Sequence, residues 1–169
     1  MKHDRHTYRG KALSDQHVKI GEWVYGGLFK TEDGCWIVRL SPGEFEAGII
    51  QHIRVDPDTV GQCTGLTDKN GTAIFEGDVL EYVGRYRYVV RFGSANFNPP
   101  CCADDYRIGW YLEGVDRSTN DRAEPIHDNS RFAARFPEHC ADYPENANMF
   151  IFEIIGNIHD NPEMVGVGK

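Results

Sequence analysis

Long apolar runs, regularly spaced cysteines and helical periodicity are all missing from this chain of 169 residues. No apolar stretch approaches the ~20 residues that a membrane helix needs, so no membrane span is expected. The amino-terminal letters MKHDRHT are too polar for a secretory signal. The five cysteines are an odd number at irregular spacing, which favours reduced thiols over a disulfide framework. These absences predict a soluble protein of a reducing cytoplasm.

Sequence motifs of catalysis are missing too. There is no Gly-x-Ser-x-Gly nucleophile elbow, and the carboxy-terminal GVGK lacks the first glycine and the helix of a phosphate loop. Acids do occur in pairs, but such pairs are common and carry no spacing signature of their own. We predict no catalytic residue, while a metal-assisted hydrolase or nuclease stays an alternative. The acid pairs are Asp104-Asp105, Glu76 with Asp78, and Asp160 with Glu163.

Cysteine and histidine are also poorly spaced for a metal ion. Zinc ligands usually come as pairs about two to four residues apart, whereas here the candidates are direct neighbours in the chain. Convergence of these side chains in space is the open alternative, and we predict no metal and no cofactor. The candidates are Cys101, Cys102, His127, His139 and Cys140.

The composition is that of a globular protein, with 40% apolar and 26% charged residues. The net charge of -8 is spread unevenly along the chain. Residues 1–30 hold six Lys/Arg and three Asp/Glu, and residues 31–169 hold twelve and twenty-three. An acidic body argues against non-specific nucleic-acid binding, which depends on neutralising phosphates. A small basic patch remains compatible with this balance.

Short apolar runs between turn residues predict a mostly β protein. Asn70-Gly71 is the strongest hairpin signal and predicts a type I′ turn. Glu76-Gly77-Asp78 follows, with the glycine giving a tight start to the next strand and the acids in solvent. The YRGK segment at 8–11 is an edge strand, a partner contact or a mobile arm. The other strands are expected at 23–29, 35–40, 44–55, 79–83, 86–92 and 149–155.

The strand at 86–92 alternates between apolar and basic side chains. Tyr86, Tyr88, Val90 and Phe92 hold the even positions, and arginines hold two of the odd ones. Since successive side chains point to opposite faces of a strand, the even positions should enter the core and the arginines should meet water.

Four blocks in order resemble the YopX family, whose members are encoded by phages and prophages. The longest is VDPDTVGQCTGLTDKNGTAIFEGDV at 55–79, joined by YRGK at 8–11, WVYG at 23–26 and EIIGNIHDNPEM at 153–164. The resemblance implies an SH3-type β-roll, the cytoplasm of a bacterial host and no assigned biochemical activity. The region between 94 and 148 lies outside these blocks.

The predicted fold is therefore mainly β, an SH3-like barrel or roll with an N-terminal β-rich portion at 1–56 and the roll at 57–169. A long irregular insertion at 94–148 contains one possible strand at 109–115 and a possible helical turn at 131–136. The late strand at 149–155 should close the roll and lie beside 86–92.

Candidate binding residues are basic or aromatic. Arg85, Arg87 and Arg91 form either a phosphate-binding face or a solvated strand face that discourages edge pairing. Tyr25 and Trp110 are candidate partner contacts, because aromatic residues are enriched at binding hot spots. Trp23 and Trp36 are expected to fill the core.

The leading hypothesis is a non-enzymatic phage or prophage accessory protein that binds a host or phage protein. Nucleic-acid binding through the Arg87/Arg91 face and the basic amino-terminal region is the second hypothesis. Homo-oligomerisation is also open.

Overall fold

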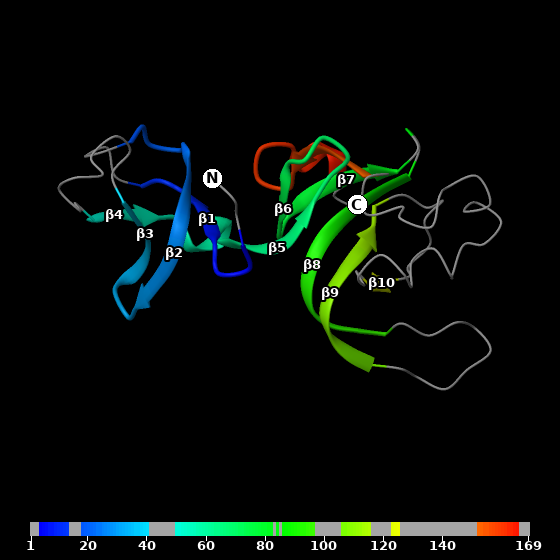
Figure 1. Ribbon diagram of the computed structural model, residues 1–169, viewed down its shortest axis with the longest axis horizontal. Helices are drawn as coiled ribbons and strands as arrows, with labels where there is room; N and C mark the ends of the chain where they lie inside the picture. The colour runs from blue at the N-terminus through cyan, green and yellow to red at the C-terminus, as the bar shows by residue number, and fades with distance from the viewer. Residues whose placement is uncertain are drawn as a thin grey trace. The chain divides into compact units, whose positions relative to one another are not determined.

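The computed structural model describes the chain at residues 4–13, 18–40, 50–82, 84, 86–96, 106–115, 123–125 and 152–165. Over these ranges the protein is mainly β, with antiparallel strands in two sheets and short 3-10 turns (Figure 1). The mainly β prediction is confirmed. No helix in the described ranges is long and apolar enough to cross a membrane. The chain divides into two compact units, Met1–Gly65 and Leu66–Lys169.

The first unit is built on one antiparallel sheet with the strand order β4-β3-β2-β1-β5. The predicted strands at 23–29, 35–40 and 44–55 correspond to its β2, β3 and β4. Asp56 caps the 3-10 turn η1 between β4 and β5, where its carboxylate accepts the Asp58 N–H at 3.1 Å. The elements are β1 (Tyr8–Lys11), β2 (Trp23–Thr31), β3 (Gly34–Leu40), β4 (Ile50–Val55), η1 (Pro57–Thr59) and β5 (Gly61–Thr67).

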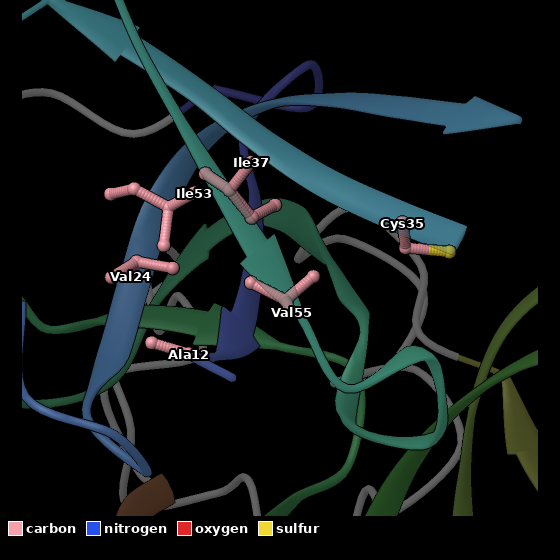
Figure 2. Packing of buried hydrophobic residues seen from close by; sticks show 6 residues of the cluster. All are labelled: Ala12, Val24, Cys35, Ile37, Ile53 and Val55. Atoms are coloured by element: carbon pink, nitrogen blue, oxygen red, sulfur yellow. The ribbon is translucent and has the colours of Figure 1, made fainter. Parts of the chain in front are cut away.

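Alternation along these strands places small and β-branched side chains in one buried cluster, which Figure 2 shows converging from β2, β3 and β4. Trp23 and Trp36 are half-buried on the opposite face, because each is a chain neighbour of a cluster residue. The prediction that these tryptophans fill the core is wrong. The cluster consists of Ala12, Val24, Cys35, Ile37, Ile53 and Val55.

Strand β1 lies inside the sheet. It pairs with β2 along its whole length and with β5 at Tyr8 and Arg9. Past its end, the Leu13 N–H donates to Arg54 O at 2.8 Å and the Asp56 N–H donates to Lys11 O at 2.9 Å. These bonds flank a bridge between Ala12 and Val55, so the sheet curls around the cluster. The YRGK segment is thus an interior strand, and neither an edge strand nor a mobile arm.

The second unit holds a sheet with the strand order β10-β9-β8-β7-β11. Its core combines side chains from β6, β7, β8, β9 and β11, namely Ile74, Leu80, Val90, Leu112 and Phe152. The elements are β6 (Ala73–Phe75), β7 (Asp78–Tyr82), β8 (Tyr86–Asn96), β9 (Tyr106–Gly114), β10 (Ala123–Pro125), β11 (Phe152–Asn157) and η3 (Pro162–Val165).

Two expectations for this unit need correction, and a third is not confirmed. The region at 94–148 is not irregular throughout, since β9 and β10 lie within it and β9 pairs with β8 from Tyr88 to Asn96. The late strand β11 pairs with β7 and not with 86–92. Neither sheet closes over the described residues, so the SH3-like barrel is not confirmed. The predicted helical turn at 131–136 lies outside those residues.

The hairpin signal at Asn70-Gly71 is confirmed, but its turn type is not. The Gly71 N–H donates to Asp68 O at 3.0 Å, which makes Lys69 and Asn70 the central turn residues. Gly71 follows with φ of 80°, the left-handed position of a turn with a bulge. Leu66 and Thr67 at the end of β5 lead into this turn, and β6 leaves it.

At residues 76–78, the predicted tight turn at Gly77 is correct, but the prediction that Asp78 lies in solvent is wrong. Gly77 has φ of 81°, a conformation that favours glycine. Asp78 is 2% exposed, and its carboxylate accepts the Phe75 N–H at 2.8 Å. The buried N–H of Phe75, which precedes the turn, is therefore satisfied by the carboxylate of Asp78, which follows Gly77.

Candidate binding surfaces

The predicted arginine face lies on β8 and is occupied by ion pairs. Arg87 Nε is 3.5 Å from Glu81 Oε2 on β7, and Arg91 Nε is 2.8 Å from Glu113 Oε2 on β9. Both arginine side chains are partly exposed, at 43% and 33%. Arg85 lies outside the described residues. The sheet thus holds each described arginine beside a carboxylate.

This pairing weakens the electrostatic case for phosphate binding at the arginine face. A phosphate would have to compete with Glu81 and Glu113 for the two guanidinium groups. Glu153 on β11 also stands directly across from Glu81, with Lys69 Nζ 2.6 Å from its carboxylate. The solvated strand face is the better interpretation of this pattern, and the hypothesis of binding there stays a prediction.

Trp110 lies on β9 in an apolar row that continues the core face of the second sheet. It pairs across the hairpin with Phe92, and the two rings meet edge to face with centroids 4.9 Å apart. Phe92 is 50% exposed and Ile108 is 79% exposed. The prediction that the even side chains of 86–92 enter the core therefore fails at Phe92. We call Phe92, Ile108 and Trp110 the hairpin patch.

The hairpin patch is exposed because the β8–β9 hairpin extends past its neighbour. The β7–β8 pairing stops at Val79 with Val89, whereas the β8–β9 pairing runs on to Asn96 with Tyr106. Figure 1 shows the far part of this hairpin reaching beyond β7. In the described part of the chain, no strand pairs with the outer edge of β8 from Phe92 onward. Sequence reasoning missed Ile108, because it lies just before the possible strand at 109–115 and the pairing of that strand with β8 was not predicted.

Tyr25 lies on β2 beside a cluster of cations and aromatic rings. It stands across from Arg9, whose guanidinium carbon is 4.6 Å from the ring centroid of Trp23. Lys11 Nζ is 5.5 Å from the same centroid. Arg9 is only 7% exposed, so the Trp23 ring already serves as a packing surface for cations within the protein.

A second row of exposed rings lies on the same side of β2, β3 and β4. Phe29 pairs across the strands with Trp36, and Trp36 pairs with Arg54. Phe29 is 54% exposed, Arg54 is exposed and Trp36 is half-buried. We call this surface the outer face. Its residues are Gly27, Phe29, Trp36, Val38, Leu40, Ile50, His52 and Arg54.

Comparison with known proteins gives the chain a family. The family model described as YopX protein matches residues 22–165. The chain belongs to the YopX family. The family assignment predicted from the four sequence blocks is therefore confirmed, and the match includes the hairpin patch and the outer face of this YopX protein. No curated protein is similar enough to the chain to count as a match.

Metal-binding chemistry finds no support in the described part of this YopX protein. No group of three or more His, Cys, Asp or Glu side chains there is placed to hold a metal ion. Cys35 and Cys63 are buried thiols, and the Cys63 sulfur accepts the Gly65 N–H at 3.4 Å. Asp160 accepts the side-chain amide of Asn157 at 2.7 Å, which gives that acid a local role in a turn. The candidate ligands Cys101, Cys102, His127, His139 and Cys140, with Asp104-Asp105, lie outside the described residues.

Proposed function

We propose that this YopX protein is a non-enzymatic phage or prophage accessory protein that binds an extended segment of a host or phage protein at the β8–β9 hairpin. The observation that carries the proposal is the hairpin patch beside the outer edge of β8. An added strand would satisfy the backbone groups of that edge, and its apolar side chains would cover the patch. The SH3-like roll that the family resemblance implies is part of the same proposal.

The chemistry of this surface favours an apolar strand over a charged ligand. Arg91, the neighbour of Phe92 on β8, is already paired with Glu113 on β9, so these two charges neutralise each other. Phe92 and Trp110 provide rigid aromatic area of the kind that dominates protein interfaces. The partner segment should therefore alternate apolar and polar residues and need no strong charge.

Site-specific photo-crosslinking in host cells tests the proposal. A photoreactive amino acid at Ile108 should give one dominant protein adduct, whereas the same group at Phe29 should not give that adduct. The purified partner should then lose about tenfold or more in affinity for Ile108→Ser or Trp110→Ser. Both variants should keep the circular dichroism spectrum of the parent protein.

Two outcomes would contradict the proposal. Adducts at Ile108 that contain only a second copy of this chain would assign the hairpin to self-association. A partner that binds Ile108→Ser and Trp110→Ser as well as the parent protein would place the interface elsewhere.

A further inference from the structure

In the first unit, the charged side chains on the strands are all basic, although the whole chain is acidic. The strands β1 to β5 contain five Lys/Arg, namely Arg9, Lys11, Lys30, Arg39 and Arg54, and no Asp or Glu. The whole chain carries a net charge of -8. The five strands as described therefore carry cationic side chains and no carboxylate.

The outer face contributes one of these cations, Arg54, together with flat, accessible side chains, whereas alternation places Lys30 and Arg39 on the opposite side of the sheet. Phe29, Trp36 and Arg54 form one row across three strands, with the Phe29 and Trp36 ring centroids 6.3 Å apart. The Arg54 guanidinium donates to Asp33 O at 3.2 Å, which fixes its position at the end of the row. Two aromatic rings and a guanidinium plane are the side-chain types on which unpaired nucleic-acid bases stack.

The residues beside this row of Phe29, Trp36 and Arg54 are small or exposed. Gly27 is exposed and has no side chain, and His52 is exposed on β4, across from the half-buried Val38 on β3. Leu40 and Ile50 pair across the strands, and each is more than half exposed, at 57% and 56%. Asp56 follows Arg54 by two residues, and Glu32 and Asp33 stand in the β2–β3 turn, so these acids lie outside the strands of the face.

We propose that the outer face binds single-stranded nucleic acid, with bases stacked on Phe29 and Trp36 and with Arg54 contacting a base or a phosphate. Arg54, together with Lys11 on the same side of the sheet, favours an anionic occupant, and the exposed rings favour one with flat apolar surfaces. A duplex hides its bases, and an acidic peptide lacks them. This proposal goes beyond the protein-binding function and uses a surface in the other unit, so either can fail without the other.

Fluorescence anisotropy with a labelled oligo-dT of about 20 nucleotides and purified protein tests the inference. Binding should occur at about 50 mM salt and weaken steeply as salt is raised. Phe29→Ala and Trp36→Ala should each weaken it about tenfold or more. Arg54→Gln should weaken it and lower the salt slope by roughly 0.7, the value for one phosphate contact on a single strand.

Matched controls lie in the second unit. Phe92→Ala removes another half-exposed aromatic ring, and Arg91→Gln removes another partly exposed arginine; both should leave oligonucleotide affinity unchanged. A second readout uses Trp36 itself. The chain has three tryptophans, so Trp23→Phe/Trp110→Phe leaves Trp36 as the single one, and its emission should be quenched by oligo-dT.

Several results would overturn the proposal. One is no binding at low salt. Another is binding that survives Phe29→Ala and Trp36→Ala but is lost in Arg87→Glu, which would assign it to the arginine face. A third is displacement of oligo-dT by poly-glutamate at equal charge concentration, because stacking would then contribute nothing.

Discussion

The carboxylate of Asp68 accepts the backbone N–H of Ile154 at 3.3 Å, although 86 residues separate them in the chain. The same side chain accepts the N–H of Thr72 at 2.8 Å and that of Asn70 at 2.9 Å. One acid that is 1% exposed thus shapes the hairpin turn and ties it to β11. The Lys69 N–H completes the junction by donating to Phe152 O at 2.9 Å.

Asp68→Ala should lower the free energy of unfolding by about 3 kcal/mol, because several backbone donors lose a charged acceptor at once. Asp68→Asn keeps one side-chain oxygen and should cost less. Urea denaturation measures both changes, and amide hydrogen exchange should show the Ile154 N–H losing protection in Asp68→Ala. Equal stability of the parent and Asp68→Ala would rule out this role.

A second link at the same junction depends on pH. Lys69 Nζ lies 2.6 Å from Glu153 Oε2, and this hydrogen bond, with the attraction between the charges, holds the pKa of Glu153 below its usual 4.5. Because the folded pKa is depressed, the pair stabilises the protein above pH 4.5, and this stabilisation is lost as the pH falls through the folded pKa. The gain is small, since both side chains are nearly half exposed, at 44% and 42%.

The measurement is an NMR titration of the Glu153 side chain in the parent protein and in Lys69→Met. The pKa should rise toward 4.5 in the variant. An unchanged titration curve would show that Lys69 does not hold this carboxylate in solution.

Arg87 stands at one end of a row of charged residues across three strands. Glu153 on β11 pairs with Glu81 on β7, and Glu81 pairs with Arg87 on β8. Arg87→Glu would place three carboxylates side by side and should destabilise the protein by about 1 kcal/mol. Thermal unfolding at low salt measures the loss, which added salt should reduce. Arg87→Gln is the control and should cost less, and a loss that is independent of salt would point to packing instead.

Turn residues and the alternation of apolar and polar side chains predicted most of the strands. They failed where the burial of a strand depends on which strands pair with it. Asn70-Gly71 and Gly77 located turns because positive φ is a local property. The burial of β1 could not be predicted, because four polar residues become interior only when β2 and β5 flank them. The alternation of side chains along β2 and β3 does not show which face of each strand enters the core. The large tryptophan rings were predicted to be buried, but Val24 and Ile37 are the buried residues.

The candidate surfaces were predicted only in part for the same reason. Trp110 was identified as an aromatic contact, but Ile108 and Phe92 join it only through the β8–β9 register. Nothing in the sequence distinguishes Arg54 from other strand residues, because its position beside Trp36 follows only from the pairing of β3 with β4.

Ile53 and Ile50 on β4 provide a test of the first core, since one strand carries both. Ile53 is 2% exposed within the buried cluster, whereas Ile50 is 56% exposed. Ile53→Ala should cost about 3 kcal/mol through lost burial and the cavity left behind. Ile50→Ala should change the free energy of unfolding by no more than about 0.5 kcal/mol. Chemical denaturation compares the two, and similar costs would mean that the cluster is not the stabilising core.

Gly26 and Gly27 offer the sharpest comparison, because they are neighbours with opposite surroundings. A Cβ added at Gly26 would lie 2.3 Å from Val38 O, a backbone atom that cannot move aside alone. A Cβ added at Gly27 would lie 3.8 Å from Val38 O, which is an ordinary van der Waals contact. Gly26→Ala should therefore destabilise the first unit by about 1–3 kcal/mol or more, as overpacking does.

Gly27→Ala should be neutral or slightly stabilising, since alanine restricts the unfolded chain. The comparison also bears on how β2 passes from one neighbour to the next. Its pairing with β1 ends at Gly26, and its pairing with β3 begins at Gly27. If close approach at Gly26 lets the sheet curl there, Gly26→Ala should expose Cys35 to thiol reagents faster than Gly27→Ala does. Equal thiol reactivity and equal stability in the two variants would refute a special role for Gly26.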